Sequence, residues 1–147
     1  MATASPRNHQ FVHKLGAAVV IDHTQPDWPD QVRDVTDGGA ERVLACAAPT
    51  LRGAARAARD GATIATPVHA ELPAAERVRW QRYDGKPRGS RLIRMAPWFD
   101  DGSLSAHVAA RYFLQDAAKA HREVERGHTR GKIVLIVDED LAADLGV

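Results

Sequence analysis

The sequence lacks the features that mark secreted and membrane proteins. It has a single cysteine, Cys46, so no disulfide can form within the chain. No apolar run approaches the roughly 20 residues that a membrane helix needs, and no charged-then-apolar signal pattern opens the chain. The net charge of +1 gives no overall attraction to nucleic acid or to an anionic membrane. These absences predict a cytoplasmic protein with neither nucleic-acid nor membrane partners.

The sequence also lacks the glycine-rich loop G-x-G-x-x-G of dinucleotide-binding proteins. In those proteins, backbone N–H groups of the loop and of the following helix hold the pyrophosphate. The stretches "GAAVVID" and "DGGAERV" do not supply such a loop. The main pyrophosphate cradle is therefore absent from this sequence.

What the first half does contain is an alternation of short apolar runs and helical segments. Apolar runs rich in β-branched residues predict buried strands at 17–22, 42–47 and 62–67. Capping residues and glycines predict helices that begin at Ser5-Pro6 and end at Gly16, span 27–39, and span 51–60 before Gly61. This alternation is typical of βαβ units with a parallel sheet and helices on both faces.

The second half is less regular. It predicts an edge strand at 77–83, a turn-rich loop at 84–90 and a helix at 91–102 that Pro97 should kink or end. A strand at 107–113, a helix at 114–127 and a strand at 131–140 follow, and the helix carries one face of Leu114, Ala118, His121 and Val124. We expect one domain at 1–103, a strand-helix-strand segment at 104–140 and a tail at 141–147.

Four stretches of the sequence resemble the medium-chain dehydrogenase/reductase superfamily. They are "ATASPRNHQFVHKLGAAVVID", "VRDVTDGGAERVLACA", "LRGAARAARDGATIATP" and "LQDAAKAHREVERGHTRGKIVLIVDED". The resemblance is greatest to quinone oxidoreductase-like and zinc-type alcohol dehydrogenase-like members, and it covers roughly residues 2 to 140. Members are about twice as long, with a GroES-like catalytic domain before and after a Rossmann domain. The resemblance therefore implies the C-terminal half of such an enzyme, without the catalytic domain or the first Rossmann strand.

The resemblance implies that residues 1–103 are a partial nucleotide-binding domain, with a truncated Rossmann-like parallel sheet that has a gap in its middle. In the strand order 3-2-1-4-5-6, the first strand lies between strands 2 and 4. Without it, two rows of backbone groups would lose their partners, at a cost of about 1 kcal/mol or more for each buried group. We expect the C-terminal strand "KIVLIV" or a second copy of the chain to close the sheet.

The resemblance places the adenosine ribose of a dinucleotide near the end of the second Rossmann strand. Ser5, Arg7 and Asn8 occupy that stretch, which implies an NADP-type site rather than an NAD-type site. Ala47 and Thr66 match places where the family's backbone passes the cofactor. The alternative is structural: Ser5 and Pro6 also form a plain helix start, and Arg7 is then an ordinary exposed residue.

The sequence offers little for metal or thiol chemistry. His9 and His13 have the i, i+4 spacing of two zinc ligands, but no third ligand is evident, and the family's zinc ligands lie outside the matching half. No zinc site is expected. Cys46 falls within the predicted buried strand 42–47, where a free cysteine behaves as a small apolar residue.

Candidate acid–base residues follow two of the predicted strands. Asp22 and His23 come at the end of the strand at 17–22, and His69 follows the strand at 62–67. Ligands of open α/β sheets bind at the carboxyl ends of the strands, so these side chains are candidate catalytic groups. The alternative is that they are ordinary loop residues.

Aromatic side chains gather in the irregular second half, at Trp80, Tyr83, Trp98 and Phe99. They could line an apolar pocket or cover a subunit contact. The resemblance favours a homodimer, formed through the edge strand at 77–83 or through an exchanged C-terminal strand.

Three hypotheses about function follow. The first is a shortened reductase that binds NADP(H), alone or with a partner chain that supplies the other half, does not transfer hydride by itself and binds a small-molecule ligand. The second is a repurposed, cofactor-independent cyclase, isomerase or dehydratase that acts on an apolar metabolite in bacterial biosynthesis. The third is a non-catalytic scaffold. The abundance of alanine and arginine suggests a GC-rich bacterial genome.

Overall fold

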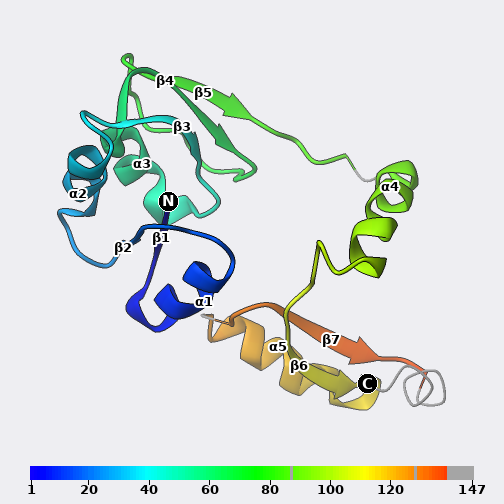
Figure 1. The fold of residues 1–147 in the computed structure, drawn as a ribbon. Helices are drawn as coiled ribbons and strands as arrows, with labels where there is room; N and C mark the ends of the chain where they lie inside the picture. Colours follow the sequence, from blue (N-terminus) through cyan, green and yellow to red (C-terminus); the bar gives the residue numbers. More distant parts are fainter. Residues whose placement is uncertain (87, 128, 139–147) are drawn as a thin grey trace. The chain divides into compact units, whose positions relative to one another are not determined.

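The computed structural model describes residues 1–86, 88–127 and 129–138 (Figure 1). These residues form two compact units, which divide after Lys86. The division predicted from the sequence, after residue 103, falls within the second unit. The expected tail at 141–147 and the end of the last expected strand, 139–140, lie outside the described residues.

The first unit alternates strands and helices in the predicted order. Its elements are β1 (Ala2–Ala4), η1 (Pro6–Asn8), α1 (His9–Lys14), β2 (Val20–Asp22), α2 (Trp28–Val35), β3 (Ala40–Leu44), η2 (Ala48–Thr50), α3 (Leu51–Ala57), β4 (Ala58–Thr66) and β5 (Arg79–Arg82). Each predicted helix therefore exists, but the helices and most of the strands are shorter than the sequence pattern suggested.

The strands of the first unit form two parallel sheets. β1 pairs with β2, while β4 lies between β3 and β5, which makes β5 an edge strand as predicted. This confirms the α/β class with parallel strands. In the order 3-2-1-4-5-6, the two sheets correspond to strands 3-2 and 4-5-6, so the position of strand 1 falls between β1 and β3.

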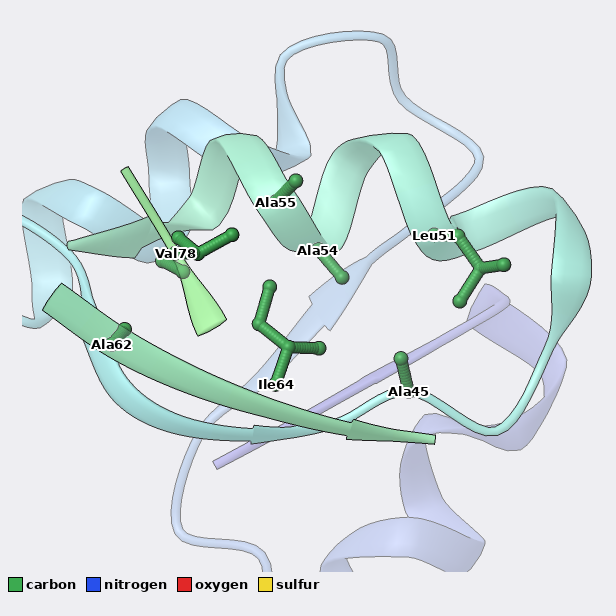
Figure 2. Close-up of a cluster of buried hydrophobic side chains, with 8 residues drawn as sticks. Ala45, Leu51, Ala54, Ala55, Ala62, Ile64 and Val78 are labelled. Carbon is green, nitrogen blue, oxygen red and sulfur yellow. The ribbon is translucent and has the colours of Figure 1, made fainter. Parts of the chain in front are cut away.

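The main core of the first unit lies between α3 and the three-stranded sheet. Figure 2 shows Ile64 of β4 directed at Ala54 of α3. Ile64 is fully buried, and burying such a side chain contributes about 1.5–3 kcal/mol. Small side chains on α3 let the helix approach the sheet closely. The buried cluster is Ala45, Leu51, Ala54, Ala55, Ala58, Ala62, Ile64 and Val78.

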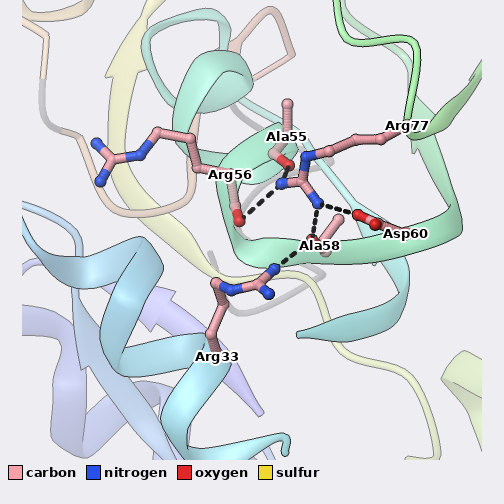
Figure 3. Close-up of polar contacts among 6 residues, drawn as sticks. All are labelled: Arg33, Ala55, Arg56, Ala58, Asp60 and Arg77. Atoms are coloured by element: carbon pink, nitrogen blue, oxygen red, sulfur yellow. Dashed lines mark hydrogen bonds and ion pairs between the residues drawn. The ribbon is translucent and has the colours of Figure 1, made fainter. Parts of the chain in front are cut away.

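The end of α3 differs from the prediction of a helix to residue 60. The helix ends at Ala57, and Gly61 lies inside β4 with a φ of +77°. Figure 3 shows why: the guanidinium of Arg77 donates to the carbonyl oxygens of Ala55, Arg56 and Ala58 and to the carboxylate of Asp60. Arg77 thus satisfies carbonyls that the helix leaves without donors.

The second unit contains α4 (Gly89–Asp100), β6 (Val108–Phe113), η3 (Leu114–Asp116), α5 (Ala117–Glu125) and β7 (Lys132–Ile136). α4 continues past Pro97 to Asp100, so the proline does not end this helix. The other expectation, a kink at Pro97, stays a prediction. Within the described ranges, no helix is both long and apolar enough to cross a membrane.

β7 pairs in parallel with β6, from Val108 and Lys132 to Phe113 and Ile136. The C-terminal strand was expected to close the gap in the first sheet. Because its partner in the structure is β6, closure by this strand within one chain is not observed. Exchange of the strand between two copies stays a prediction.

The predicted apolar face of α5 is not its buried face. The buried residue of α5 is Ala120, whereas Val124 of α5 is 60% exposed and Leu114, which lies in η3, is 52% exposed. Across the buried side, the hydroxyl of Tyr112 on β6 donates to the carboxylate of Glu123 on α5. The helix therefore packs through a small residue and a polar pair.

Candidate functional site

A cleft of about 550 Å³ separates β1 from β3. Residues 1–3 line one side of it and residues 42–47 line the other. Trp28 and Val32 of α2 and Ala54 and Ala57 of α3 contribute the helical part of the lining. We call this space the inter-sheet cleft. It lies at the point where the strand order reverses, which is where open α/β sheets bind their ligands.

The lining of the inter-sheet cleft is mostly apolar. Among the described residues, the ionisable side chains that line it are those of His23, Arg42 and Cys46, and none is a carboxylate. Arg42 is exposed and carries a permanent positive charge. The cleft therefore suits an uncharged or anionic occupant better than a cationic one.

Asp22 is the last residue of β2, and His23 follows it and lines the cleft. The N–H and the hydroxyl of Thr24 donate to Oδ1 of Asp22 at 2.9 and 2.7 Å, and Nε2 of Gln25 donates to Oδ2 at 3.2 Å. These bonds, that of the Thr24 N–H above all, hold the pKa of Asp22 below its usual value. No hydrogen bond joins Asp22 to His23 in the described part of the chain. The hydrogen bonds of Asp22 instead stabilise the loop that follows β2.

His69 lies apart from the inter-sheet cleft lining. Its Nε2 is 3.5 Å from Oδ1 of Asp84, and both side chains are exposed. The structure therefore does not gather Asp22, His23 and His69 into one cluster. Their proposed acid–base roles stay a prediction, with His23 as the member that borders the cleft.

The candidate ribose-binding residues follow the end of β1. Ser5 occupies the N-cap position of η1, but its hydroxyl makes no capping bond and accepts instead from Nδ2 of Asn8 at 3.2 Å. Arg7 is exposed. Ser5, Arg7 and Asn8 thus lie within four consecutive residues, and a hydroxyl, an amide and a guanidinium can each donate a hydrogen bond to a phosphate.

The other two candidate cofactor residues differ from each other. Ala47 is exposed and lines the cleft. Thr66 is fully buried: its hydroxyl donates to the Ala45 carbonyl at 2.7 Å and accepts from the Val68 N–H at 3.0 Å. Thr66 therefore ties the end of β4 to the end of β3, and its side chain offers no exposed surface to a ligand.

Cys46 is exposed and lines the inter-sheet cleft, so the prediction that it is buried within a strand is wrong. β3 ends at Leu44, and no described strand covers the edge of β3 that faces the cleft. Sequence reasoning also missed Arg42 as a lining residue. Neither Cys46 nor Arg42 belongs to a sequence motif. The only sequence signal for the cleft was the gap expected in the strand order.

The histidine pair at i, i+4 has structural partners. His9 Nε2 lies 2.9 Å from the Ala4 carbonyl oxygen, and His13 Nδ1 lies 2.7 Å from the Ala17 carbonyl oxygen. Among the described residues, no group of three or more potential ligands could hold a metal ion. The side chains of the described residues, 1–86, 88–127 and 129–138, therefore do not provide the ligand set of a zinc site.

Comparisons with known proteins agree with this architecture. The zinc-binding dehydrogenase family matches residues 15–135. A structure of an NAD-dependent alcohol dehydrogenase is 29% identical with a TM-score of 0.74, over 92% of this chain and 43% of that chain. A search of curated proteins found no match.

Two further solved structures share the fold at lower identity. An alcohol dehydrogenase superfamily protein from Novosphingobium aromaticivorans is 18% identical, with a TM-score of 0.77 over 94% of this chain and 48% of that chain. A mycobacterial protein complexed with NADPH is 21% identical, with a TM-score of 0.71 over 92% and 48%. This chain thus spans a little under half the length of the structures it matches.

Proposed function

Because this chain belongs to the zinc-binding dehydrogenase family, within the medium-chain dehydrogenase/reductase superfamily, we propose that it is the nucleotide-binding part of an NADP(H)-dependent oxidoreductase. The proposal includes a quinone or enone reductase, or an alcohol dehydrogenase-like enzyme. The observation that carries it is the inter-sheet cleft, which opens at the reversal of the strand order with the end of β1 on one side and the end of β3 on the other.

Ser5, Arg7 and Asn8 would hold the 2′-phosphate on the adenosine ribose of NADP(H). A guanidinium and a phosphate form charge-assisted hydrogen bonds, which are about twice as strong as neutral ones. Ala47 at the end of β3 would border the cofactor through its backbone. When bound, the nicotinamide ring supplies or accepts a hydride; the residues of this chain only bind and orient the cofactor.

The pyrophosphate lacks a comparable site in this sequence. No G-x-G-x-x-G loop is present, and Thr66 already uses its hydroxyl within the protein. Hydride transfer also needs a second wall that places the substrate against the nicotinamide. We therefore include in the proposal that these 147 residues do not transfer hydride by themselves. Because the described residues do not fit zinc, no step of the proposal uses that metal.

The test is a titration of the chain with NADPH, followed by the fluorescence of the bound nicotinamide, with NADH as the comparison ligand. We expect weak binding that favours NADPH. Arg7→Ala should weaken NADPH binding roughly tenfold, since a hydrogen bond to a charged group contributes about 1.5–3 kcal/mol. It should leave NADH binding unchanged, because NADH carries no 2′-phosphate.

The matched control is Arg94→Ala, which removes an exposed arginine from α4 of the second unit. This variant should bind NADPH as the unaltered chain does. Equal affinity for NADH and NADPH, or an Arg7→Ala variant with unchanged preference, would contradict the NADP-type site. Absence of binding by either cofactor would contradict the proposal for the chain alone.

A further inference from the structure

Three arginine side chains border a hollow of about 370 Å³ near the point where α3 ends and β4 begins. They are Arg33 of α2, Arg56 of α3 and Arg77, which precedes β5. The carboxylates of Asp30 and Asp60 complete the described lining. We call this space the arginine hollow. Its volume falls within the range of roughly 300–1,000 Å³ that small-molecule sites occupy.

Two of these guanidinium groups meet at one carbonyl oxygen. Nη1 of Arg33 donates to the oxygen of Ala58 at 3.0 Å, and Nη1 of Arg77 donates to the same oxygen at 2.8 Å (Figure 3). A carbonyl oxygen accepts hydrogen bonds but carries no net charge, so it positions the two cations without neutralising them. The fold therefore holds two positive charges next to each other at the hollow.

The carboxylates of the arginine hollow compensate for only part of its positive charge. Asp60 pairs with Arg77 at 3.0 Å, and Asp30 pairs with Arg56 at 3.1 Å. Among the described residues, no carboxylate pairs with Arg33. Three guanidinium groups thus face two carboxylates, and the charge without a counter-ion is that of Arg33.

Arg33 also has hydrogen-bond donors to spare. A guanidinium has five N–H groups, and in the described part of the chain the hydrogen bond of Arg33 is the one to the Ala58 carbonyl. Arg77 differs, because it donates to three carbonyl oxygens and to Asp60 and is thereby fixed in place. Arg33 is therefore the group with the capacity to bind a ligand, and Arg77 is a fixed charge beside it.

This arrangement suits a phosphate group. The planar fork of a guanidinium matches two phosphate oxygens and binds them through charge-assisted hydrogen bonds. A phosphate monoester carries about −1.5 to −2 charges at neutral pH, more than a carboxylate, so it gains more from two adjacent cations. The side chains of Asp30 and Asp60 are 61% and 84% exposed, so water weakens their repulsion of a bound anion.

The arginine hollow is separate from the inter-sheet cleft. No described residue lines both. The hollow lies near Ala58, where β4 begins, whereas ligands of open α/β sheets bind at the carboxyl ends of the strands. The hollow therefore does not belong to the proposed cofactor site.

We propose that the arginine hollow binds a phosphate group, either as inorganic phosphate or as the monoester of a small metabolite. Arg33 is its principal ligand, and Arg77 adds the fixed positive charge. This inference does not depend on cofactor binding, so it and the proposed function can fail separately.

The probes are inorganic phosphate and glycerol 3-phosphate, titrated separately into the full chain at neutral pH and constant ionic strength and followed by calorimetry. We expect saturable binding of at least one probe, and the tighter of the two identifies the free ion or the monoester as the ligand. Acetate is the comparison anion and should bind at least tenfold more weakly. Binding of neither phosphate probe, or equally tight binding of acetate, would overturn the proposal.

Arg33→Gln removes the charge that has no counter-ion and should weaken phosphate binding at least tenfold. The matched control is Arg52→Gln, because Arg52 is an exposed arginine of α3 that does not line the arginine hollow. This control should bind phosphate as the unaltered chain does. An equal loss in the two variants would mean that phosphate responds only to the overall charge, and the proposal would then be wrong.

Asp60→Asn gives a result that a folding defect cannot imitate. The substitution removes a negative charge from the lining and should strengthen phosphate binding roughly threefold or more. Asp34→Asn removes a negative charge from an exposed position of α2 outside the lining and should have a smaller effect. Weaker binding by Asp60→Asn, or an equal gain in Asp34→Asn, contradicts the proposal.

Arg7→Ala separates the arginine hollow from the proposed ribose site. Arg7 does not line the hollow, so this variant should bind the phosphate probes as the unaltered chain does. If Arg7→Ala loses phosphate binding while Arg33→Gln retains it, the anion binds at the turn after β1, and the inference fails without affecting the proposed function.

Discussion

Trp28 of α2 packs against the bare Cα of Gly53 on α3. A Cβ added at Gly53 would stand 2.1 Å from Cζ2 of the indole and 2.7 Å from Cε2. No real carbon approaches another so closely without a bond, so this contact requires glycine. Because Trp28 also lines the inter-sheet cleft, the fit between the two helices sets the position of one side of the candidate site.

Gly53→Ala should destabilise the protein. The new methyl group must displace the indole or separate the helices, and overpacking of this kind costs typically about 1–3 kcal/mol. The free energy of unfolding in urea, followed by tryptophan fluorescence, measures the loss. Gly85→Ala is the control, because an added Cβ at Gly85 meets no atom within 4 Å. Equal stability of the two variants would show that Trp28 moves aside without cost.

The order of strands and helices in the first unit could be predicted from the sequence, because each apolar run is short and each is followed by a cap and an amphipathic segment. The end of α3 could not. It depends on Arg77, which lies about twenty residues beyond the helix and reaches back to its carbonyls. A local pattern such as "LRGAARAARD" contains no information about a hydrogen-bond donor that is so distant in the sequence.

Thr66→Val tests whether Thr66 is a structural residue or a cofactor ligand. The substitution keeps the shape but leaves the Ala45 carbonyl and the Val68 N–H without their partner. A buried unsatisfied group costs about 1–3 kcal/mol, so we expect a loss of that size in the free energy of unfolding. Thr66→Ser keeps the hydroxyl and should recover much of it. Unchanged stability combined with weaker NADPH binding would instead support the cofactor role.

Part of the lining of the inter-sheet cleft could be anticipated from the sequence, because His23 follows one predicted strand, Ala47 ends another, and parallel strands end at a common edge. The roles of these residues stay a prediction. What surrounds each side chain was not predictable: Asp22 is engaged by Thr24 and Gln25, and His69 by Asp84. Cys46 was missed because the run "VLACA" has the composition of a buried strand, whereas the edge of β3 beside it has no neighbour.

Asp22→Asn should destabilise the loop after β2 at neutral pH and have no effect in strong acid. The Thr24 bonds lower the pKa of Asp22 in the folded protein below its ordinary value of 3.8. A lowered pKa means that the carboxylate stabilises the fold above pH 3.8 and that this contribution is lost as the pH falls through the folded pKa. Urea unfolding at several pH values checks this, with the exposed Asp34→Asn as the control. If Asp22→Asn leaves stability unchanged at every pH, Asp22 is available for the acid–base role.

Tyr112 should ionise at higher pH than a free tyrosine. The hydrogen bond to Glu123 raises its pKa above 10.0, and burial and the charge of Glu123 add to this. A raised pKa means that the pair stabilises the fold below pH 10.0, and that this contribution is lost as the pH rises from there through the folded pKa.

The ultraviolet absorbance of tyrosinate measures this ionisation. The chain has two tyrosines, so a Tyr83→Phe variant reports Tyr112 alone. Adding Glu123→Gln to that variant removes the negative charge, and the midpoint of the titration should then move down. A midpoint that does not move would mean that Glu123 has no influence on Tyr112.

The gap between β1 and β3 changes what holds the first unit together. In the part of the chain that the structure describes, no ladder of hydrogen bonds connects the two sheets. They are connected through the helix layer, where Ile21, Val32 and Ala57 form a buried cluster with Trp28 and Ala40 packed against it. Apolar burial loses strength on cooling. The connection between the two sheets depends on this burial, so it should weaken as the temperature falls.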